Sequence, residues 1–174
     1  MAITIDSMIW IYSYDPHAPE SKNVKSWLRG KKGALQTHKQ IVLNTMIPLE
    51  ILHSISKKPS VDFTTAYNAA LGIIALKNVV LVDFNSRLLA ESMTLLGDYQ
   101  TYGIGGRDAS ILATVKDHNV MKIATHDKGI LSIPDFIRID PVFSPPLTLN
   151  VGELFDQEEF NEKLLSHRIG KVSL

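Results

Sequence analysis

Ala2-Ile3-Thr4-Ile5-Asp6 opens the chain, and this short apolar run closed by an acid decides the fold. Further apolar runs recur at residues 41–43, 79–82, 122–125 and 137–139. Between them, apolar residues recur at helical spacing, which predicts helices at 20–29, 46–57, 62–76, 86–97 and 108–118. Short apolar strands that alternate with helices predict an α/β fold, with a short-stranded parallel central sheet and helices on both of its faces.

Three details of this pattern are specific enough to compare with a structure. Residues 7–14 either extend the first strand or begin a helix, because their spacing does not decide between the two. The run Val79-Val-Leu-Val82 is apolar throughout, so we expect a strand that is covered on both faces. Residues 137–139 are expected to form the last strand, since Pro141 follows shortly after them.

The C-terminal part of the chain differs from the rest. A length of 174 residues fits one domain, or one domain with an appendage. Three prolines interrupt the periodicity at positions 141, 145 and 146, and five large apolar residues follow: Leu154, Phe155, Phe160, Leu164 and Leu165. We therefore predict a domain over residues 1–140 and an extension over residues 141–174 that contains one amphipathic helix.

Composition limits the classes of function. The chain has no cysteine, which excludes disulfides, thiolate zinc sites and cysteine nucleophiles and fits a reducing compartment. No run approaches the ~20 apolar residues that a membrane-spanning helix needs. The N-terminus lacks the basic region and long apolar stretch of a signal peptide. These features predict a cytoplasmic protein with no membrane partner.

Charge is balanced overall but uneven along the chain. Lys and Arg together number 18, as do Asp and Glu, which argues against nucleic-acid binding through a general excess of positive charge. Six basic residues nevertheless cluster around Trp27: Lys22, Lys25, Arg29, Lys31, Lys32 and Lys39. This segment is either a solvated helix face and turn or a surface that contacts a phosphate backbone.

Four acids stand where apolar segments end or where an acid is unexpected. Asp6 and Asp127 directly follow strands, Asp108 begins a helix, and Glu50 lies about one turn into the helix after strand 41–43. In a parallel sheet the carboxyl ends of the strands share one edge, so topology directs all four acids toward one rim. Carboxylates that converge repel one another, and a divalent cation relieves that repulsion. The pattern therefore predicts a metal site with oxygen ligands.

Each acid also has a purely structural explanation. Asp6 and Asp108 can be explained as caps of the helices that start beside them, and Asp127 as the cap of the turn that follows it. Glu50 is harder to explain, because an acid within an apolar helix face is costly unless it is partnered. The alternative explanation is that the Glu50 side chain is exposed on the polar side of its helix, together with three basic residues: His53, Lys57 and Lys58. These explanations stay open for single residues, whereas the joint pattern favours a site.

The order of these motifs resembles that of the PIN domain, a family of metal-dependent ribonucleases that includes the VapC-like toxins of toxin–antitoxin pairs. The stretches that carry the resemblance are Ile3-Thr-Ile-Asp6-Ser7, Met46-Ile-Pro-Leu-Glu50-Ile51, Gly105-Gly-Arg-Asp108-Ala-Ser-Ile-Leu-Ala113 and Ile123-Ala-Thr125-His-Asp127. The resemblance covers residues 1–140, so the extension over 141–174 exceeds the minimal domain.

The resemblance implies an endoribonuclease that hydrolyses RNA with Mg²⁺ or Mn²⁺ as its cofactor. Asp6, Glu50, Asp108 and Asp127 are the implied metal ligands and catalytic acids. Thr125 is the hydroxyl that we expect to orient a water or a carboxylate, ahead of Ser7. The implied partners are an RNA substrate and a protein antitoxin. Whether the chain forms a homodimer is left open.

Two other functions stay open. The first is a catalytically inactive PIN-like module that binds RNA or serves assembly, although the presence of all four acids argues against it. The second is a phosphate-accepting domain, which is disfavoured because Asp6 is followed by Ser7 and Met8 and not by the second Asp expected of many phosphohydrolases. His126 is expected to have a structural role beside Asp127.

Overall fold

A computed structural model describes residues 1–59 and 61–169 of the chain. Six strands form one sheet in the order β3-β2-β1-β4-β5-β6. Their bounds are β1 Ala2–Ile5, β2 Gln40–Asn44, β3 Val79–Val82, β4 Lys122–Ala124, β5 Ile137–Asp140 and β6 Leu147–Leu149. All neighbouring strands pair in parallel except β5 and β6. The predicted α/β fold around a parallel sheet is confirmed.

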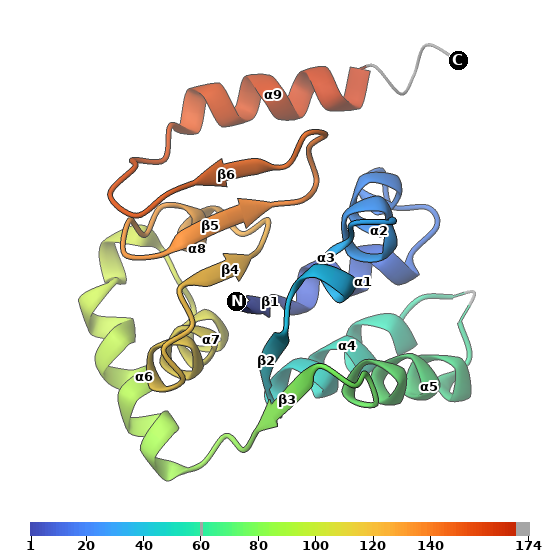
Figure 1. The fold of residues 1–174 in the computed structure, drawn as a ribbon, viewed down its shortest axis with the longest axis horizontal. Helices are drawn as coiled ribbons and strands as arrows, with labels where there is room; N and C mark the ends of the chain where they lie inside the picture. The colour runs from blue at the N-terminus through green and yellow to red at the C-terminus, as the bar shows by residue number, and fades with distance from the viewer. Residues whose placement is uncertain (60, 170–174) are drawn as a thin grey trace.

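Helices lie on both faces of this sheet (Figure 1). One face carries α1 Ser7–Tyr14, α2 Ser21–Arg29, α3 Ala34–Thr37, α4 Met46–Ser56 and α5 Phe63–Ile74. The other face carries α6 Ser86–Asp98 and α7 Gly106–Asp117, joined by the short 3-10 helix η1 Gln100–Tyr102. The short helix α8 Lys128–Leu131 follows β4, and α9 Gln157–Ile169 lies beyond β6.

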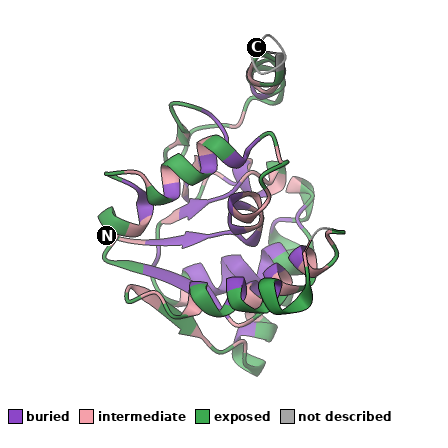
Figure 2. Ribbon diagram, turned by 90° about the vertical axis from the view of Figure 1, so that its right-hand side faces the viewer, coloured by how far each residue is buried: buried purple, intermediate pink, exposed green. Residues whose placement is uncertain are grey.

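The core is built on the central strands (Figure 2). Ile3 and Ile5 of β1 and Ile41 and Leu43 of β2 are completely buried, because helices cover both faces of these strands. Residues 7–14, which the sequence left undecided, form helix α1, with Trp10 buried against the sheet. Asp6 has an extended backbone and is therefore the point at which strand changes to helix.

Two expectations about strands were wrong. β3 lies at an edge of the sheet rather than inside it, and Val80 and Leu81 are 37% and 41% exposed. An apolar run indicates a strand but not its neighbours, which depend on the order of strands in space. Residues 137–139 are not the last strand either, because β6 follows and pairs antiparallel with β5. At three residues, β6 is too short for its periodicity to be recognised.

The predicted C-terminal helix is present as α9, but it starts later than the apolar residues suggested. Leu154 and Phe155 precede the helix, and Leu154 is 82% exposed. Phe160 is the main anchor, since it is buried against Phe143 and Leu131. Among the described helices, none combines the length and the apolar character required to traverse a lipid bilayer.

Candidate active site

Asp6 lies at the carboxyl end of β1, and its side chain is completely buried. Thr125 donates a hydrogen bond from Oγ1 to Asp6 Oδ2 over 2.8 Å, and Ser7 donates from Oγ to Asp6 Oδ1 over 3.1 Å. Burial raises the pKa of Asp6 to about 6, although the two hydroxyl bonds lower it. Asp108 adds a smaller repulsive contribution in the same direction as burial. A carboxylate buried in this way has a strong electrostatic preference for a nearby cation.

Thr125 links Asp6 to Asp127. β1 and β4 are parallel neighbours, so the residues that follow them meet at one edge of the sheet. Besides donating to Asp6, Thr125 Oγ1 accepts a hydrogen bond from the Asp127 amide over 3.0 Å. Asp127 also accepts from the Ile130 amide through Oδ1 and so caps α8, as its structural explanation anticipated. Asp127 therefore caps α8 and is also linked to Asp6 through Thr125.

Asp108 lies in the first turn of α7, where the helix begins two residues earlier than the sequence indicated. Gly105 is the N-cap, and its amide donates to Asp108 Oδ2 over 2.8 Å. Asp108 Oδ1 is buried and has no hydrogen-bond partner. Burial raises the pKa of Asp108, and the charges of Asp127 and Glu50 raise it further against the Gly105 amide and Arg107. A buried carboxylate oxygen without a hydrogen bond is available to a cation.

Glu50 extends from α4 toward Asp108 and pairs with Arg107, the residue before Asp108. The Arg107 guanidinium donates from Nη1 to Glu50 Oε1, and its Nε lies 3.7 Å from Asp108 Oδ1. Glu50 Oε2 is buried without a partner. The alternative that exposes Glu50 on a polar side is wrong, because its side chain is only 17% exposed and Lys58 pairs with Asp15. Of the three basic residues in that alternative, His53 does line the same hollow as Glu50.

Arg107 was not predicted as a site residue, although it directly precedes Asp108 in Gly105-Gly-Arg-Asp108. Burial lowers the pKa of Arg107, but the charges of Glu50, Asp108 and Asp6 outweigh it and raise the pKa overall. The guanidinium therefore supplies positive charge to the acids from within the chain.

Asn44 was also missed, and it fixes the two helices that carry Asp108 and Glu50. This buried amide at the end of β2 donates from Nδ2 to the Ser110 carbonyl over 3.1 Å and to Thr114 Oγ1 over 3.2 Å, both on α7. Its Oδ1 accepts from the Met46 amide at the start of α4 over 3.1 Å. A polar residue at the end of an apolar strand was the available signal.

The residue between Thr125 and Asp127 has the structural role that we expected. His126 Nδ1 lies 2.7 Å from Asp140 Oδ2, and Asp140 Oδ1 accepts from the Val142 amide over 3.0 Å. The His126 ring packs on Phe160 of α9 at 5.6 Å between centroids. The C-terminal extension therefore braces the turn that carries Asp127.

Asp108 thus interacts electrostatically with each of the other three acids, Asp6, Asp127 and Glu50. Within the described ranges, no three His, Asp or Glu side chains are close enough to form a ready-made metal site. The donor set nevertheless suits Mg²⁺ or Mn²⁺, because these ions prefer oxygen and bind through one or two carboxylates and several waters. The orphaned oxygens of Asp108 and Glu50 are suitable ligands.

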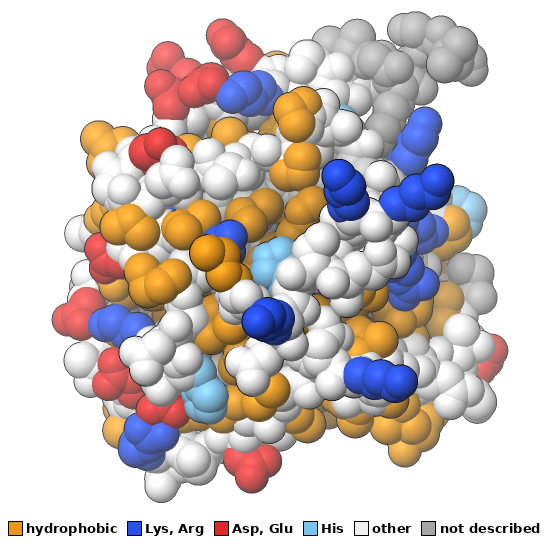
Figure 3. All heavy atoms as spheres, viewed as in Figure 1, with side chains coloured by type: hydrophobic (Ala, Val, Ile, Leu, Met, Phe, Trp, Pro, Cys, Tyr) orange, Lys and Arg blue, Asp and Glu red, His pale blue; other side chains and the backbone are white. Residues whose placement is uncertain are grey.

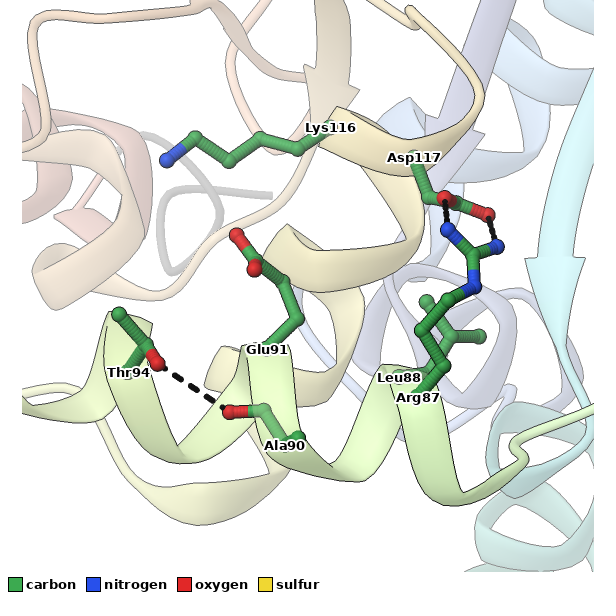
Figure 4. Close-up of a pocket in the computed structure, with 7 residues that line it drawn as sticks. All are labelled: Arg87, Leu88, Ala90, Glu91, Thr94, Lys116 and Asp117. Carbon is green, nitrogen blue, oxygen red and sulfur yellow. Dashed lines mark hydrogen bonds and ion pairs between the residues drawn. The ribbon is translucent and has the colours of Figure 1, made fainter.

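A hollow of about 430 Å³ lies between α6 and α7 (Figure 4). Arg87 and Asp117 form a two-pronged ion pair there, with Nη2 and Oδ2 2.6 Å apart. This pair lowers the pKa of Asp117. Neither these groups nor the other lining residues belong to the acidic quartet, so the hollow is separate from the candidate active site.

Comparison with known proteins gives one family match and several structural matches. A sequence model described as the PIN domain matches residues 3–135. No curated protein sequence matches the chain.

Three solved structures illustrate the likeness in fold. VapC20 from Mycobacterium tuberculosis, described as a sarcin-ricin loop cleaving toxin, is 13% identical with a TM-score of 0.60, covering 74% of this chain and 94% of that one. FitAcB from Neisseria gonorrhoeae is 20% identical with a TM-score of 0.60, covering 80% and 97%. VapBC2 from Rickettsia felis, bound to promoter DNA, is 18% identical with a TM-score of 0.54, covering 79% and 97%. At these identities the likeness shows the fold alone.

Proposed function

Because the chain belongs to the PIN domain family, we propose that it is a metal-dependent endoribonuclease and the toxin of a toxin–antitoxin pair. The observation that carries the proposal is that Asp108 interacts electrostatically with the other three carboxylates and has a buried Oδ1 that makes no hydrogen bond. A buried acidic cluster of this kind is expensive unless a cation completes it.

Asp6, Glu50, Asp108 and Asp127 are the residues that would hold Mg²⁺ or Mn²⁺. When bound, the ion lowers the pKa of a coordinated water and neutralises charge on the phosphate. Thr125 keeps Asp6 and Asp127 in a fixed relation by donating to one and accepting from the other. The amino end of α7 favours the ionised form of Asp108 and a nearby phosphate. Attack by water in line with the leaving oxygen would leave a 5′-phosphate and a 3′-hydroxyl.

The RNA substrate and the protein antitoxin are parts of the proposal. The sarcin-ricin loop that VapC20 cleaves makes a structured RNA loop a sensible first substrate. Co-expression with a small neighbouring open reading frame would test the antitoxin. A protein that suppresses the activity and binds the chain in stable stoichiometry is the expected result.

The experiment that tests the proposed function compares three substitutions. Asp6→Asn and Asp108→Asn should each reduce Mg²⁺- or Mn²⁺-dependent cleavage of RNA to background while circular dichroism shows a folded chain. Asp98→Asn removes an exposed acid outside the quartet and should cleave like the parent. Unchanged cleavage in Asp6→Asn and Asp108→Asn would refute the assignment.

A second candidate function is a PIN-like module that binds RNA without cutting it. The pairing of Glu50 with Arg107 favours it, because an internal cation already satisfies part of the charge. This alternative predicts that the parent chain binds RNA but shows no cleavage at millimolar Mn²⁺.

A further inference from the structure

The basic segment of the chain forms an exposed stripe, in which the Arg29 guanidinium lies over the Tyr14 ring at 5.5 Å from its centroid. Residues 21–49 contain six Lys and Arg and no Asp or Glu. Lys22, Lys25 and Arg29 are exposed and follow one another at helical spacing along α2, over about 10 Å. Among the described residues, no acid lies within ion-pairing distance of Lys22 or Lys25.

This stripe gives a neutral protein a strongly uneven surface. Figure 3 shows Lys and Arg gathered at the right of the molecule, over the region of α2 and α3, whereas Asp and Glu lie mostly at the left and the top. Unpaired lysines at this density favour a polyanion, because each neutralised phosphate releases a bound counterion.

A hollow with an aromatic wall adjoins the stripe. It measures about 310 Å³ and lies between α2 and the loop after β5, with Lys22, Asn23, Ser26 and Trp27 on one side and Phe143 and Ser144 on the other. Trp27 is half-buried, so part of its indole is accessible. An aromatic side chain beside cations is the combination that binds single-stranded nucleic acid, where bases stack and phosphates pair with charge.

The hollow connects to the acidic quartet through a short series of contacts. Asn23 donates to the Val142 carbonyl over 2.7 Å. Phe143, the next residue, packs on the His126 ring at 6.4 Å between centroids. His126 lies between Thr125 and Asp127 in the chain, so Phe143 of the hollow packs on the turn that carries Asp127.

From this arrangement we propose that α2 and the loop 141–146 bind the RNA strand that flanks the cleaved bond. Lys22, Lys25 and Arg29 contact successive phosphates, and Trp27 stacks on one base. The inference rests on the proposed function and adds to it that the substrate is single-stranded beside the cut, because only an unpaired base can stack on an indole.

The test measures the affinity of the full-length chain for a fluorescein-labelled single-stranded RNA at several salt concentrations. Every protein carries Asp6→Asn, so that no cleavage occurs. The double variant Lys22→Gln/Lys25→Gln is compared with Lys57→Gln/Lys77→Gln, which removes the same charge from exposed positions elsewhere. The slope of log affinity against log salt should become shallower by about 1.4, and affinity at 0.15 M salt should fall about tenfold, only in the α2 variant.

Trp27→Leu provides the second variant. Its affinity should fall at least about fivefold while the salt slope stays unchanged, because stacking does not involve phosphate charge. Thermal melting of each protein separates this result from a folding defect.

Equal RNA affinities for the α2 variant and its control would overturn the proposal. The stripe would then be a candidate binding surface for an acidic protein partner. The proposed function is judged separately, by metal-dependent cleavage in the chain with Asp6 intact. Cleavage that persists alongside equal affinities would therefore refute the stripe alone. A chain that neither cleaves nor binds RNA would refute both.

Discussion

The candidate active site has two halves that are built differently. On one side, Asp6 and Asp127 follow two adjacent strands, and Thr125 joins them with hydrogen bonds of 2.8 and 3.0 Å. On the other, Asp108 and Glu50 come from two helices, and each has a buried carboxylate oxygen that makes no hydrogen bond. Between these two acids lies Arg107, whose side chain is 47% exposed. The strand half is therefore preformed, whereas in the helix half the Arg107 guanidinium supplies the positive charge, and we expect a metal ion to replace it.

The largest expected effect concerns the preformed half. Thr125→Val keeps the shape of the side chain but removes both hydrogen bonds, leaving Asp6 Oδ2 without its donor and the Asp127 amide without its acceptor. Cleavage should fall by roughly 10- to 100-fold, as it does when groups that orient metal ligands are lost. The matched variant Thr125→Ser keeps the hydroxyl and should stay near the parent. Equal rates for Val and Ser would show that the hydroxyl is not needed.

The next effect concerns the pH dependence of stability. The free energy of unfolding is measured with denaturant at several pH values, in the presence of a chelator that removes metal ions. The folded chain keeps a proton on Asp6 up to a pKa of about 6, whereas the unfolded chain loses it near the ordinary value of 3.8. The free energy of unfolding should therefore decrease as pH rises from about 4 to 7, with Asp6 contributing about 3 kcal/mol.

Asp6→Asn provides the comparison for this pH profile. In this variant the free energy of unfolding should still decrease with rising pH, but by less than in the parent, because burial raises the pKa of Asp108 as well. A profile identical in the parent and in Asp6→Asn would contradict the buried, uncompensated state of Asp6.

A third prediction concerns how the two halves are held together. Asn44→Leu removes the amide that bonds both α7 and α4, and it leaves the Met46 amide without its acceptor. The free energy of unfolding should fall by about 1 to 3 kcal/mol. Ser92→Ala, which removes a buried hydrogen bond within α6 alone, is the control for loss of a polar group. Cleavage corrected for the folded fraction should fall in Asn44→Leu and not in the control.

The smallest effect is expected in the replaceable half. Arg107→Gln removes the internal cation, so the affinity for Mn²⁺ measured by calorimetry should rise severalfold, because the ion no longer displaces an ion pair. Arg107→Lys keeps a positive charge and should bind Mn²⁺ more like the parent. Weaker Mn²⁺ binding in Arg107→Gln would mean that Arg107 supports the metal site instead of competing for it.

The sequence predicted the strand half better than the helix half, for a physical reason. Asp6, Thr125 and Asp127 lie at or just after the ends of apolar runs. Parallel strands bring their carboxyl ends to one edge of the sheet, and this does not depend on how the side chains pack. The pairing of Arg107 with Glu50 depends on how α4 and α7 are rotated and spaced, which no local pattern determines. The same limit applies to Asn44, whose partners lie 66 and 70 residues away.

The errors in the predicted fold have a similar origin. Val79–Val82 reads as a buried strand, but its place at the sheet edge follows from the order of all six strands. In the extension, Leu154 and Leu165 looked like core residues of a helix, yet they are 82% and 60% exposed. An apolar side chain at helical spacing needs a partner surface, and the sequence does not say where that surface ends.

The central claim is that the four acids share one hard cation, and a crystal of the parent chain soaked in Mn²⁺ tests it most directly. We predict an anomalous scattering peak beside Asp108 Oδ1 and within water-bridged reach of Asp6, with the Arg107 guanidinium released from Glu50. No peak at millimolar Mn²⁺, or a peak remote from Asp6 and Asp108, would contradict the claim.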